Sequence, residues 1–549
     1  MMNAIRKPTI LTGALVGACF TAALIAVFYL IGQLVGTPFV PFDIFDWVGR
    51  VLPGPLITFG IDTIVNIITT LKLGETSSAA KAAEQFMAIG GMFATGVVAG
   101  AVLFAIVRRS EMKSGRTVGI VIGLVIGVPV MLISASVNLN ATTPPIVNAI
   151  WILLAFAVWG WLLAWAYDRL VELGVSEAST GNAVEAIDRR QFLVRMGSAT
   201  AAITVVGAGV GALLSQAETP SQATALNTGD TTEMAKPWSA SNTLPNADDT
   251  LVPAAGTRSE LTPLAQHYRI DINTIPPEIR EEEWKLSIGG LVDAPLEMTL
   301  DDIKAYEPMH QFVTLACISN RIAGDLIGTT RWTGVSLKKL VPDFKLKPNA
   351  THLKITAADN FDEFVALDTI NNDDRVMLAY AWDGLPLEVK HGFPLRIYIP
   401  NHYGMKQPKW ITNIEAVEGW QEGWWVRRGW DKDAIMRATS VIDTVAVDDA
   451  VVGDGSQKLI PVGGIAHAGD RGISKVEVKV DDGEWVEAKL RKPLSDVTWV
   501  IWRYDWPFVE GRHTFAVRAY EGDGTPQIET DAGARPSGAT GIHTVTESV

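Results

Sequence analysis

The stretch from Thr314 to Leu337, TLACISNRIAGDLIGTTRWTGVSL, contains the cysteine on which the interpretation of this chain depends. The 549 residues include two cysteines, and Cys19 lies in an apolar run near the N-terminus, so Cys317 has no plausible partner for an intramolecular disulfide. It is therefore a packed thiol, a nucleophile or a metal ligand. A polar Ser-Asn-Arg run nearby argues against plain packing. Histidines that could act as a base exist elsewhere, but nothing local resembles a thiol-enzyme signature.

The composition indicates a membrane portion joined to water-exposed domains. Hydrophobic residues make up 48% of the chain, charged residues 19%, and the mean hydropathy is +0.20. The net charge of −14 argues against nucleic-acid binding, because phosphate contacts rely on clustered lysine and arginine. Two cysteines exclude a disulfide framework, a CxxC motif, covalent c-type haem and cysteine-ligated iron–sulfur clusters. No flavin motif is present either.

Apolar runs in the first third of the chain are long enough to cross a bilayer. Four long runs are followed by a milder fifth, and together they cover about 10–35, 86–107, 117–138, 146–166 and 196–214. A shorter apolar stretch, 57–71, carries Asp62 and Asn66 and predicts an interfacial or re-entrant helix. We therefore predict a membrane region over residues 1–215 that contacts the lipid bilayer. The first histidine is His267, which excludes a bis-histidine haem within this region and favours a plain anchor.

Positive charges predict the orientation of these spans. With five spans, the three basic clusters all fall on one side, which the positive-inside rule makes cytoplasmic. Everything after the fifth span is then extracytoplasmic, at the cell membrane of a prokaryote. The clusters are Arg6 and Lys7, then Arg108, Arg109, Lys113 and Arg116, and finally Arg189, Arg190 and Arg195.

The fifth run begins with DRRQFLVRMGSATAAITVVGAGVGALLSQA, and two interpretations of its arginines stay open. The commoner one is a plain positive-inside pair before a helix. The segment 189–214 also resembles a twin-arginine export signal, which moves domains that have already folded and so allows a cofactor to be inserted first. The small-x-small form of Ser215-Gln216-Ala217 is typical of a cleavage site.

Three further sections follow the membrane region. Residues 216–263 are polar and proline-containing, and predict a flexible linker that spans on the order of 35–40 Å. Residues 264–435 mix short strand-like runs such as HLKITA with helical segments, which predicts an α+β domain. In residues 436–549, apolar side chains alternate before glycine-containing turns, which predicts an all-β, immunoglobulin-like sandwich.

Two blocks of this sequence resemble the sulfite oxidase family of molybdopterin-dependent oxidoreductases. The first is the opening stretch, with its cysteine, nearby Asn-Arg and W-x-G-V-x-L. The second, DGLPLEVKHGFPLRIYIPNHYGMKQPKWITNIEAVEGW, contains HGFP-x-R and G-x-K-x-x-KW. Two further matches, HYRIDINTIPPEI and GGLVDAPLEMTLDDI, precede the cysteine. The tail with GGIAHAGDRGISKVEVKVDDGEW looks like the family's C-terminal dimerisation module, which implies a homodimer.

The resemblance covers about residue 265 to the C-terminus and implies a molybdenum–molybdopterin cofactor. Its metal would take the Cys317 thiolate, a soft ligand whose deprotonated form a neighbouring arginine favours. The pterin dithiolene supplies two further sulfurs. Arginine suits the cofactor phosphate because its planar fork binds two oxygens. The residues that the resemblance places on the cofactor are Tyr268, Arg269, Asn320, His391, Arg396, Lys406, Gln407 and Lys409.

Two positions depart from the sulfite oxidases. Ile322 stands where those enzymes have a second arginine facing the substrate, and Trp430 stands where they have a tyrosine. A doubly charged anion would meet an apolar and aromatic wall there, at a desolvation cost of roughly several kcal/mol. We therefore predict oxygen-atom transfer on a weakly charged substrate, a sulfoxide or N-oxide, with Cys317, Arg321 and Trp430 as the catalytic set. Family members that reduce methionine sulfoxide in proteins share the single-cysteine arrangement.

Two alternatives stay open at this point. One is a sulfite dehydrogenase, and the other is a non-catalytic binding or assembly module that keeps the fold without the metal. With no haem, flavin or iron–sulfur motif in the chain, electrons are expected to pass through a separate partner, either a cytochrome or a quinol-linked membrane protein.

Overall fold

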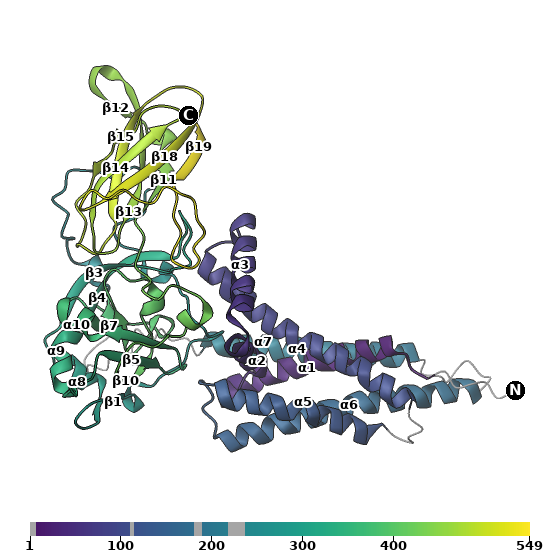
Figure 1. The fold of residues 1–549 in the computed structure, drawn as a ribbon. Helices are drawn as coiled ribbons and strands as arrows, with labels where there is room; N and C mark the ends of the chain where they lie inside the picture. Colours follow the sequence, from purple (N-terminus) through teal and green to yellow (C-terminus); the bar gives the residue numbers. More distant parts are fainter. Residues whose placement is uncertain (1–6, 110–114, 180–188, 218–235) are drawn as a thin grey trace. The chain divides into compact units, whose positions relative to one another are not determined.

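A computed structural model describes residues 7–109, 115–179, 189–217 and 236–549 (Figure 1). The chain divides into two compact units. The helical unit comprises Met1–Leu52, Ala80–Gln222 and Ile272–Ile275. The β-rich unit comprises Pro53–Ala79, Ala223–Asp271 and Pro276–Val549.

Long helices make up the helical unit, where α5 packs along α6 and α1 along α7. Their bounds are α1 (Ile10–Val35), α2 (Val40–Val51), α4 (Thr76–Arg109), α5 (Arg116–Val137), α6 (Pro145–Ser179) and α7 (Arg189–Ala217). All except α2 are long and apolar enough to cross a membrane, and α3 (Gly54–Leu71) also qualifies. The described residues therefore contain six such helices, compatible with a membrane anchor, where the sequence analysis counted five.

Glycines bring neighbouring helices of this unit into close contact. A Cβ atom added to Gly17 of α1 would lie 2.3 Å from the Gly96 carbonyl oxygen of α4. A Cβ atom added to Gly119 of α5 would lie 2.3 Å from the Gly160 carbonyl oxygen of α6. These glycines belong to small-x-x-x-small patterns, such as GALVG and GIVIG, which allow the backbones of membrane helices to approach each other. The sequence thus specifies which helix faces pack together.

Helix α3 belongs to the β-rich unit rather than to the helical one. Its polar side chains bond within that unit: Arg535 donates to the Thr58 hydroxyl, and Arg321 donates to Asn66 Oδ1 at 2.6 Å. The opposite face is apolar and exposed, and includes Ile67 at 49% and Leu71 at 63%. This amphipathic character agrees with the helix that the sequence predicted at 57–71.

Two sheets form the α+β part of the β-rich unit. The first has the order β2 (Leu296–Met298), β1 (Leu286–Gly290), β10 (Ile411–Val417), β5 (His352–Ala357) and β6 (Asp362–Ala366). The second has the order β3 (Met309–Ala316), β4 (Ile327–Ser336), β7 (Met377–Trp382) and β8 (Leu385–Pro386), with β9 (Arg396–Tyr398) also paired to β7. The short helices are α8 (Leu300–Lys304), α9 (Leu337–Leu340) and α10 (Leu367–Asn372).

One hydrophobic core contains residues of both sheets, because each presents an apolar face. In HLKITA, Leu353 and Ile355 are fully buried while His352, Lys354 and Thr356 are half-buried, as the period of two requires. Ile355 and Ile414 of the first sheet belong to the same core as Val335 and Leu378 of the second. The mixed α+β architecture predicted for this part is thus observed.

The C-terminal part is all β, as predicted, and its two sheets enclose a core. One sheet has the order β11 (Thr439–Val445), β13 (Lys458–His467), β17 (Val500–Pro507) and β16 (Lys489–Leu490), with β12 (Val451–Val452) paired to β13. The other has the order β15 (Val486–Glu487), β14 (Ile473–Val480), β18 (Arg512–Glu521) and β19 (His543–Ser548). Val476 and Val478 pack with Ile460, Val462 and Trp502 between the sheets. The immunoglobulin-like arrangement stays a prediction.

The prediction of a flexible linker over 216–263 is wrong for residues 236–263, while 218–235 lie outside the described residues. The Trp238 N–H donates to the Asp383 carbonyl at 2.6 Å, and Asn246 is fully buried. Arg491 forms an ion pair with Glu260. The polar composition that predicted a solvated coil instead supplies partners for buried groups of the β-rich unit.

Candidate functional site

Cys317 directly follows strand β3 and begins the loop that leads to β4. Its backbone N–H donates to the Leu326 carbonyl at 2.9 Å. Within the loop, the Asn320 side-chain oxygen accepts a hydrogen bond from the Leu326 N–H at 3.0 Å. Hydrogen bonds therefore fix both ends of the loop, and the cysteine and Arg321 occupy defined positions at the edge of a sheet.

The Cys317 thiol is buried, with 7% of the residue exposed, and packs among Tyr268 and Trp332. Burial raises its pKa, although the Ser319 hydroxyl, 3.0 Å from the sulfur, and the charge of Lys409 act to lower it. The sequence analysis expected a neighbouring arginine to favour the thiolate; the cation that acts on the thiol is Lys409, while Arg321 donates to Asn66 of α3. A bound metal cation would deprotonate a thiol in this position.

A cluster of aromatic and cationic side chains lies in the same buried region. The ring centroids of His267 and His391 are 5.7 Å apart, and that of His391 lies 4.4 Å from Trp382. The Arg396 guanidinium carbon lies 4.6 Å from the centre of the Trp332 ring. Tyr268 stacks on His267 at 5.5 Å, which connects this cluster to the surroundings of the thiol.

Several polar atoms of this cluster are buried without a hydrogen-bond partner in the described part of the chain. They are both ring nitrogens of His267, Nε2 of His391 and Nε of Arg396. Burial lowers the pKa of His267 to about 3 and that of His391 well below its ordinary value, so both rings are neutral near pH 7. Each unpaired buried group costs about 1–3 kcal/mol, and a neutral imidazole offers one donor and one acceptor. Such a cluster is suited to a polar ligand.

Arg269 and Lys409 meet at a shared carboxylate. Lys409 Nζ lies 3.0 Å and Arg269 Nε 2.7 Å from Asp271 Oδ2. Burial lowers the pKa of Lys409 to about 8, against the opposing effect of Asp271. Gly392 has φ +114°, and a Cβ there would lie 3.2 Å from the Cβ atoms of both Arg396 and Lys409, so glycine is needed where these cations converge.

Other predicted site residues are engaged elsewhere. Lys406 is buried and lies 2.6 Å from the fully buried carboxylate of Glu363, so its charge is already compensated within the protein. Gln407 donates to the His402 carbonyl at 2.8 Å. Trp430 packs beside Tyr403 and Met436 in a hydrophobic cluster and does not line the cavity next to the cysteine loop.

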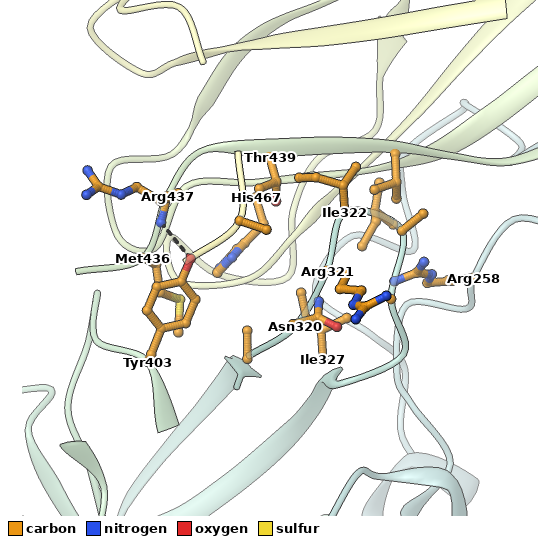
Figure 2. Close-up of a pocket in the computed structure, with 16 residues that line it drawn as sticks. Arg258, Asn320, Arg321, Ile322, Ile327, Tyr403, Met436, Arg437, Thr439 and His467 are labelled. Carbon is orange, nitrogen blue, oxygen red and sulfur yellow. Dashed lines mark hydrogen bonds between the residues drawn. The ribbon is translucent and has the colours of Figure 1, made fainter. Parts of the chain in front are cut away.

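That cavity is small, about 40 Å³, and Figure 2 shows the side chains around it. The cysteine loop contributes Asn320, Arg321 and Ile322, while the C-terminal sheets contribute apolar side chains and His467. Burial lowers the pKa of His467 to about 4, so this ring is neutral, and its Nε2 has no partner among the described residues. Polar and apolar side chains therefore share the wall about equally, and Ile322 belongs to its apolar part.

Charge at this cavity is only partly compensated. Arg258 is paired with Asp443 at 2.9 Å, and in Figure 2 the Arg437 guanidinium points away from the other labelled side chains. Arg321 donates to an amide and a hydroxyl of α3 rather than to a carboxylate. A second cavity, of about 270 Å³, shares the lining residues Arg258 and Gly324 and reaches Tyr268.

Sequence reasoning missed three residues here: His267, Asp271 and His467. The first two flank the Tyr-Arg pair in HYRIDIN, so their proximity to that pair was a signal. His467 comes from β13 of the C-terminal sheets, and no local pattern connects it to the cysteine loop.

The residues present fit a molybdopterin cofactor. In the ranges that the structure describes, no three His, Cys, Asp or Glu side chains gather as a metal ion would require. A metal held by Cys317 therefore needs a cofactor that brings ligands of its own, as a dithiolene does. The unpartnered atoms of His267, His391 and Arg396 can bind the polar edge of such a group.

Comparison with known proteins supports the resemblance to molybdopterin-dependent oxidoreductases. Residues 273–425 match the oxidoreductase molybdopterin binding domain. Sulfite oxidase of Arabidopsis thaliana is 24% identical over 276 residues, which cover 42% of this chain and 70% of that protein. Residues 273–425 are therefore a molybdopterin-binding oxidoreductase domain similar to that of the sulfite oxidases. We call residues 273–425 the molybdopterin domain.

Other relatives match the same kind of domain. The uncharacterized oxidoreductase YuiH of Bacillus subtilis is 29% identical over 148 residues, covering 27% of this chain and 72% of the relative. Nitrate reductase [NADH] 2 of Phaseolus vulgaris is 25% identical over 323 residues, covering 48% of this chain. The match spans only 36% of that nitrate reductase. The molybdopterin domain is thus an oxidoreductase domain found in proteins of different overall construction.

Proposed function

We propose that this chain is a membrane-anchored molybdenum-cofactor oxidoreductase that transfers an oxygen atom, in a two-electron reaction, from a weakly charged sulfoxide or N-oxide. The observation that carries the proposal is the cavity next to the Cys317 loop. Ile322 lines it, His467 is neutral, and Arg321 is a cation without a carboxylate partner among the described residues.

The lining favours a dipolar substrate over a dianion. A sulfoxide oxygen carries partial negative charge, which one cation can stabilise, while the carbon substituents pack on Ile322 and its apolar neighbours. Sulfite would have to lose its hydration shell against the same wall, which costs several kcal/mol when charges remain incompletely paired. The volume of about 40 Å³ also admits only a small reacting group.

The residues of this chain hold and orient the reactants. The molybdopterin group supplies oxygen-atom transfer when bound. Cys317 holds its metal, and His267, His391 and Arg396 offer the unpartnered donors and acceptors that can fix the pterin. Arg321 orients the substrate oxygen, while the neutral His467 lines the cavity, where its Nε2 can accept one hydrogen bond because the ring donates its single N–H to the Val497 backbone. Asp271 positions Arg269 and Lys409 without touching the substrate.

The substrate class is tested with the full-length enzyme loaded with cofactor. Reduction of methyl p-tolyl sulfoxide and trimethylamine N-oxide by reduced methyl viologen is compared with sulfite oxidation by ferricyanide. We expect kcat/KM for an oxide to exceed that for sulfite by at least about tenfold, equivalent to 1.4 kcal/mol. The Ile322→Arg variant should lower KM for sulfite and raise that for the sulfoxide, while Ile322→Leu should change neither.

A sulfite dehydrogenase is the second candidate, and one observation favours it. Arg258, Arg321 and Arg437 all line the cavity, and no Asp or Glu is among its described lining residues. If wild-type enzyme oxidises sulfite faster than it reduces any oxide, and Ile322→Arg leaves the sulfite KM unchanged, this candidate replaces the first.

The location of the enzyme is part of the proposal. Five spans with a cytoplasmic N-terminus leave the molybdopterin domain outside the cytoplasm, and α3, bound to the β-rich unit, is then an interfacial helix rather than a sixth span. A twin-arginine signal at 189–214 would export the folded, cofactor-loaded domain. A C-terminal epitope tag should be cleaved by protease added to intact spheroplasts, and protection of the tag would reverse the topology.

Electron exchange and assembly complete the proposal. A separate cytochrome or quinol-linked membrane protein supplies electrons, and the C-terminal sheets form an immunoglobulin-like dimerisation module. Chemical crosslinking in native membranes, followed by mass spectrometry, should recover both a redox protein and a second copy of the chain. If neither protein is recovered, the proposed redox partner and dimer are contradicted, while the proposed oxygen-transfer chemistry is unaffected.

A further inference from the structure

The helical unit contains an apolar cavity of about 180 Å³ that the chemistry at Cys317 does not use. Side chains from α1, α2, α4, α5 and α6 line it, among them Leu24, Phe45, Met92, Val130, Phe156 and Trp159. We propose that this cavity binds the head ring of an isoprenoid quinone. The proposal concerns binding alone, so it holds or fails independently of the reaction in the molybdopterin domain.

The cavity opens on the outer face of helix α4. Met87 and Gly91 line it and are exposed, Met87 at 42%. Large apolar side chains on the same helix, such as Phe86 at 76% and Val98 at 61%, are exposed as well. If α4 crosses a bilayer, this face contacts lipid, and a ligand reaches the cavity from the lipid phase. Isoprenoid quinones are dissolved in that phase.

The size and walls of the cavity suit a flat ring. An engineered apolar cavity of about 150 Å³ in another protein holds one benzene molecule, so about 180 Å³ admits a somewhat larger ring. Phe156 and Trp159 supply aromatic surface, and their ring centroids are 6.1 Å apart at an angle of 76°. A Cβ added to Gly91 would contact nothing within 4 Å, so open space adjoins this residue.

Two threonines give the cavity polar atoms that a lipid acyl chain would not use. Trp159 Nε1 donates to Thr21 Oγ1 at 3.1 Å, and no acceptor in the described residues takes the Thr21 hydroxyl proton. The Thr95 hydroxyl donates to the Gly91 carbonyl at 2.9 Å. The lone pairs of this hydroxyl oxygen accept no hydrogen bond from the described residues. The lining therefore offers one donor for a quinone carbonyl and one acceptor for a quinol hydroxyl. This pairing favours a quinone over a hydrocarbon chain.

The test measures binding to the full-length chain in nanodiscs of synthetic, quinone-free phosphatidylcholine. The probe is 2-methyl-1,4-naphthoquinone, and empty nanodiscs provide the correction for partition into lipid. We expect one saturable site per chain. The competitor 2-methylnaphthalene has nearly the same shape without the carbonyls, and it should displace the quinone only weakly.

Two variants locate the site. Gly91→Leu fills the cavity and should weaken binding at least about tenfold, or 1.4 kcal/mol. Gly90→Leu is the matched control, because a Cβ at Gly90 also contacts nothing within 4 Å but Gly90 does not line the cavity. Thr21→Val removes the donor and should weaken binding of the quinone but not of 2-methylnaphthalene. This second variant keeps the proposal testable if Gly91→Leu fails to fold. Equal binding of the hydrocarbon, or no difference between the two glycine variants, would show a cavity filled only by lipid and overturn the proposal.

Discussion

The surroundings of Cys317 and the cavity of the helical unit are both buried, but they treat polar atoms in opposite ways. Around Cys317, both nitrogens of His267 and the Nε of Arg396 lie buried with no hydrogen-bond partner among the described residues. In the helical unit, the Trp159 indole N–H is paired with Thr21 and apolar side chains surround the pair. The first region keeps costly unpaired groups in an otherwise well-formed core, and the second keeps few polar groups of any kind.

This difference indicates what each region is built to receive. Unpaired buried polar groups persist when a ligand pays back their desolvation, so the cluster around His267 indicates a polar cofactor that remains bound. A mostly apolar cavity with one donor and one acceptor indicates a largely apolar ligand that can leave again. Each of the following predictions tests one side of this contrast.

The largest effect is expected from Cys317→Ser. Without the thiolate, we expect the molybdenum content of the full-length protein to fall from near one per chain to a trace, with complete loss of oxygen-atom transfer. Inductively coupled plasma mass spectrometry on protein from a cofactor-producing host measures this content. Cys19→Ser is the matched control, since Cys19 lies in α1 of the helical unit and should leave the content unchanged.

Breaking the Lys406–Glu363 pair should reduce stability more than it reduces cofactor binding. Glu363 is fully buried at 2.6 Å from Lys406, so Glu363→Gln leaves an uncompensated charge and should cost about 3–5 kcal/mol of unfolding free energy. Denaturant unfolding of the cofactor-free chain in detergent measures this. The double variant Lys406→Met, Glu363→Leu should recover most of the loss. If it recovers stability but loses all cofactor, Lys406 binds the cofactor after all.

Acidification should destabilise the cofactor-free protein through its buried histidines. His267 has a folded-state pKa of about 3, below its unfolded value of about 6.5, so between these values only the unfolded state binds the proton. Stability therefore falls as pH drops below about 6.5, by about 2 kcal/mol at pH 5 for this residue. His267→Phe should flatten the profile by that amount. A profile identical to wild type would mean that His267 is not buried and neutral.

The smallest effect is expected in the helical unit. Trp159→Phe removes the hydrogen bond to Thr21, and such bonds in membrane proteins contribute about 0.6 kcal/mol on average. Unfolding in bicelles by added dodecyl sulfate measures the loss. Trp161→Phe is the control, because Trp161 is 37% exposed and does not line the cavity. A loss above about 3 kcal/mol would place this bond among the strongest of its kind and contradict the contrast drawn here.

Local patterns predicted much of the fold. The period of two in HLKITA defined a half-buried strand because backbone geometry alone sets that alternation, and β5 has the predicted bounds His352–Ala357. The apolar runs predicted the long helices for a similar reason, since length and hydropathy are properties of one segment. The linker was mispredicted because polar side chains such as Glu260 look the same in sequence whether they face water or Arg491.

The site was predictable where its residues share a motif with the family, and not where they meet only in space. Cys317, His391 and Arg396 are recognisable from their motifs, and the structure gathers them in one buried region. Trp430 was placed at the substrate by alignment, yet it packs in the hydrophobic cluster beside the cavity instead. His467 lies on β13 and lines the same cavity as the cysteine loop only in the folded chain. No local sequence pattern predicts this proximity.

The central claim is that Cys317 provides the protein ligand of a dithiolene-bound molybdenum. Molybdenum K-edge X-ray absorption on the full-length, cofactor-loaded protein tests it most directly, with the Cys317→Ser variant alongside. The account predicts three sulfur neighbours of the metal in the wild type and two in any molybdenum that the variant retains. An identical sulfur count in both proteins, with full molybdenum occupancy, would contradict it.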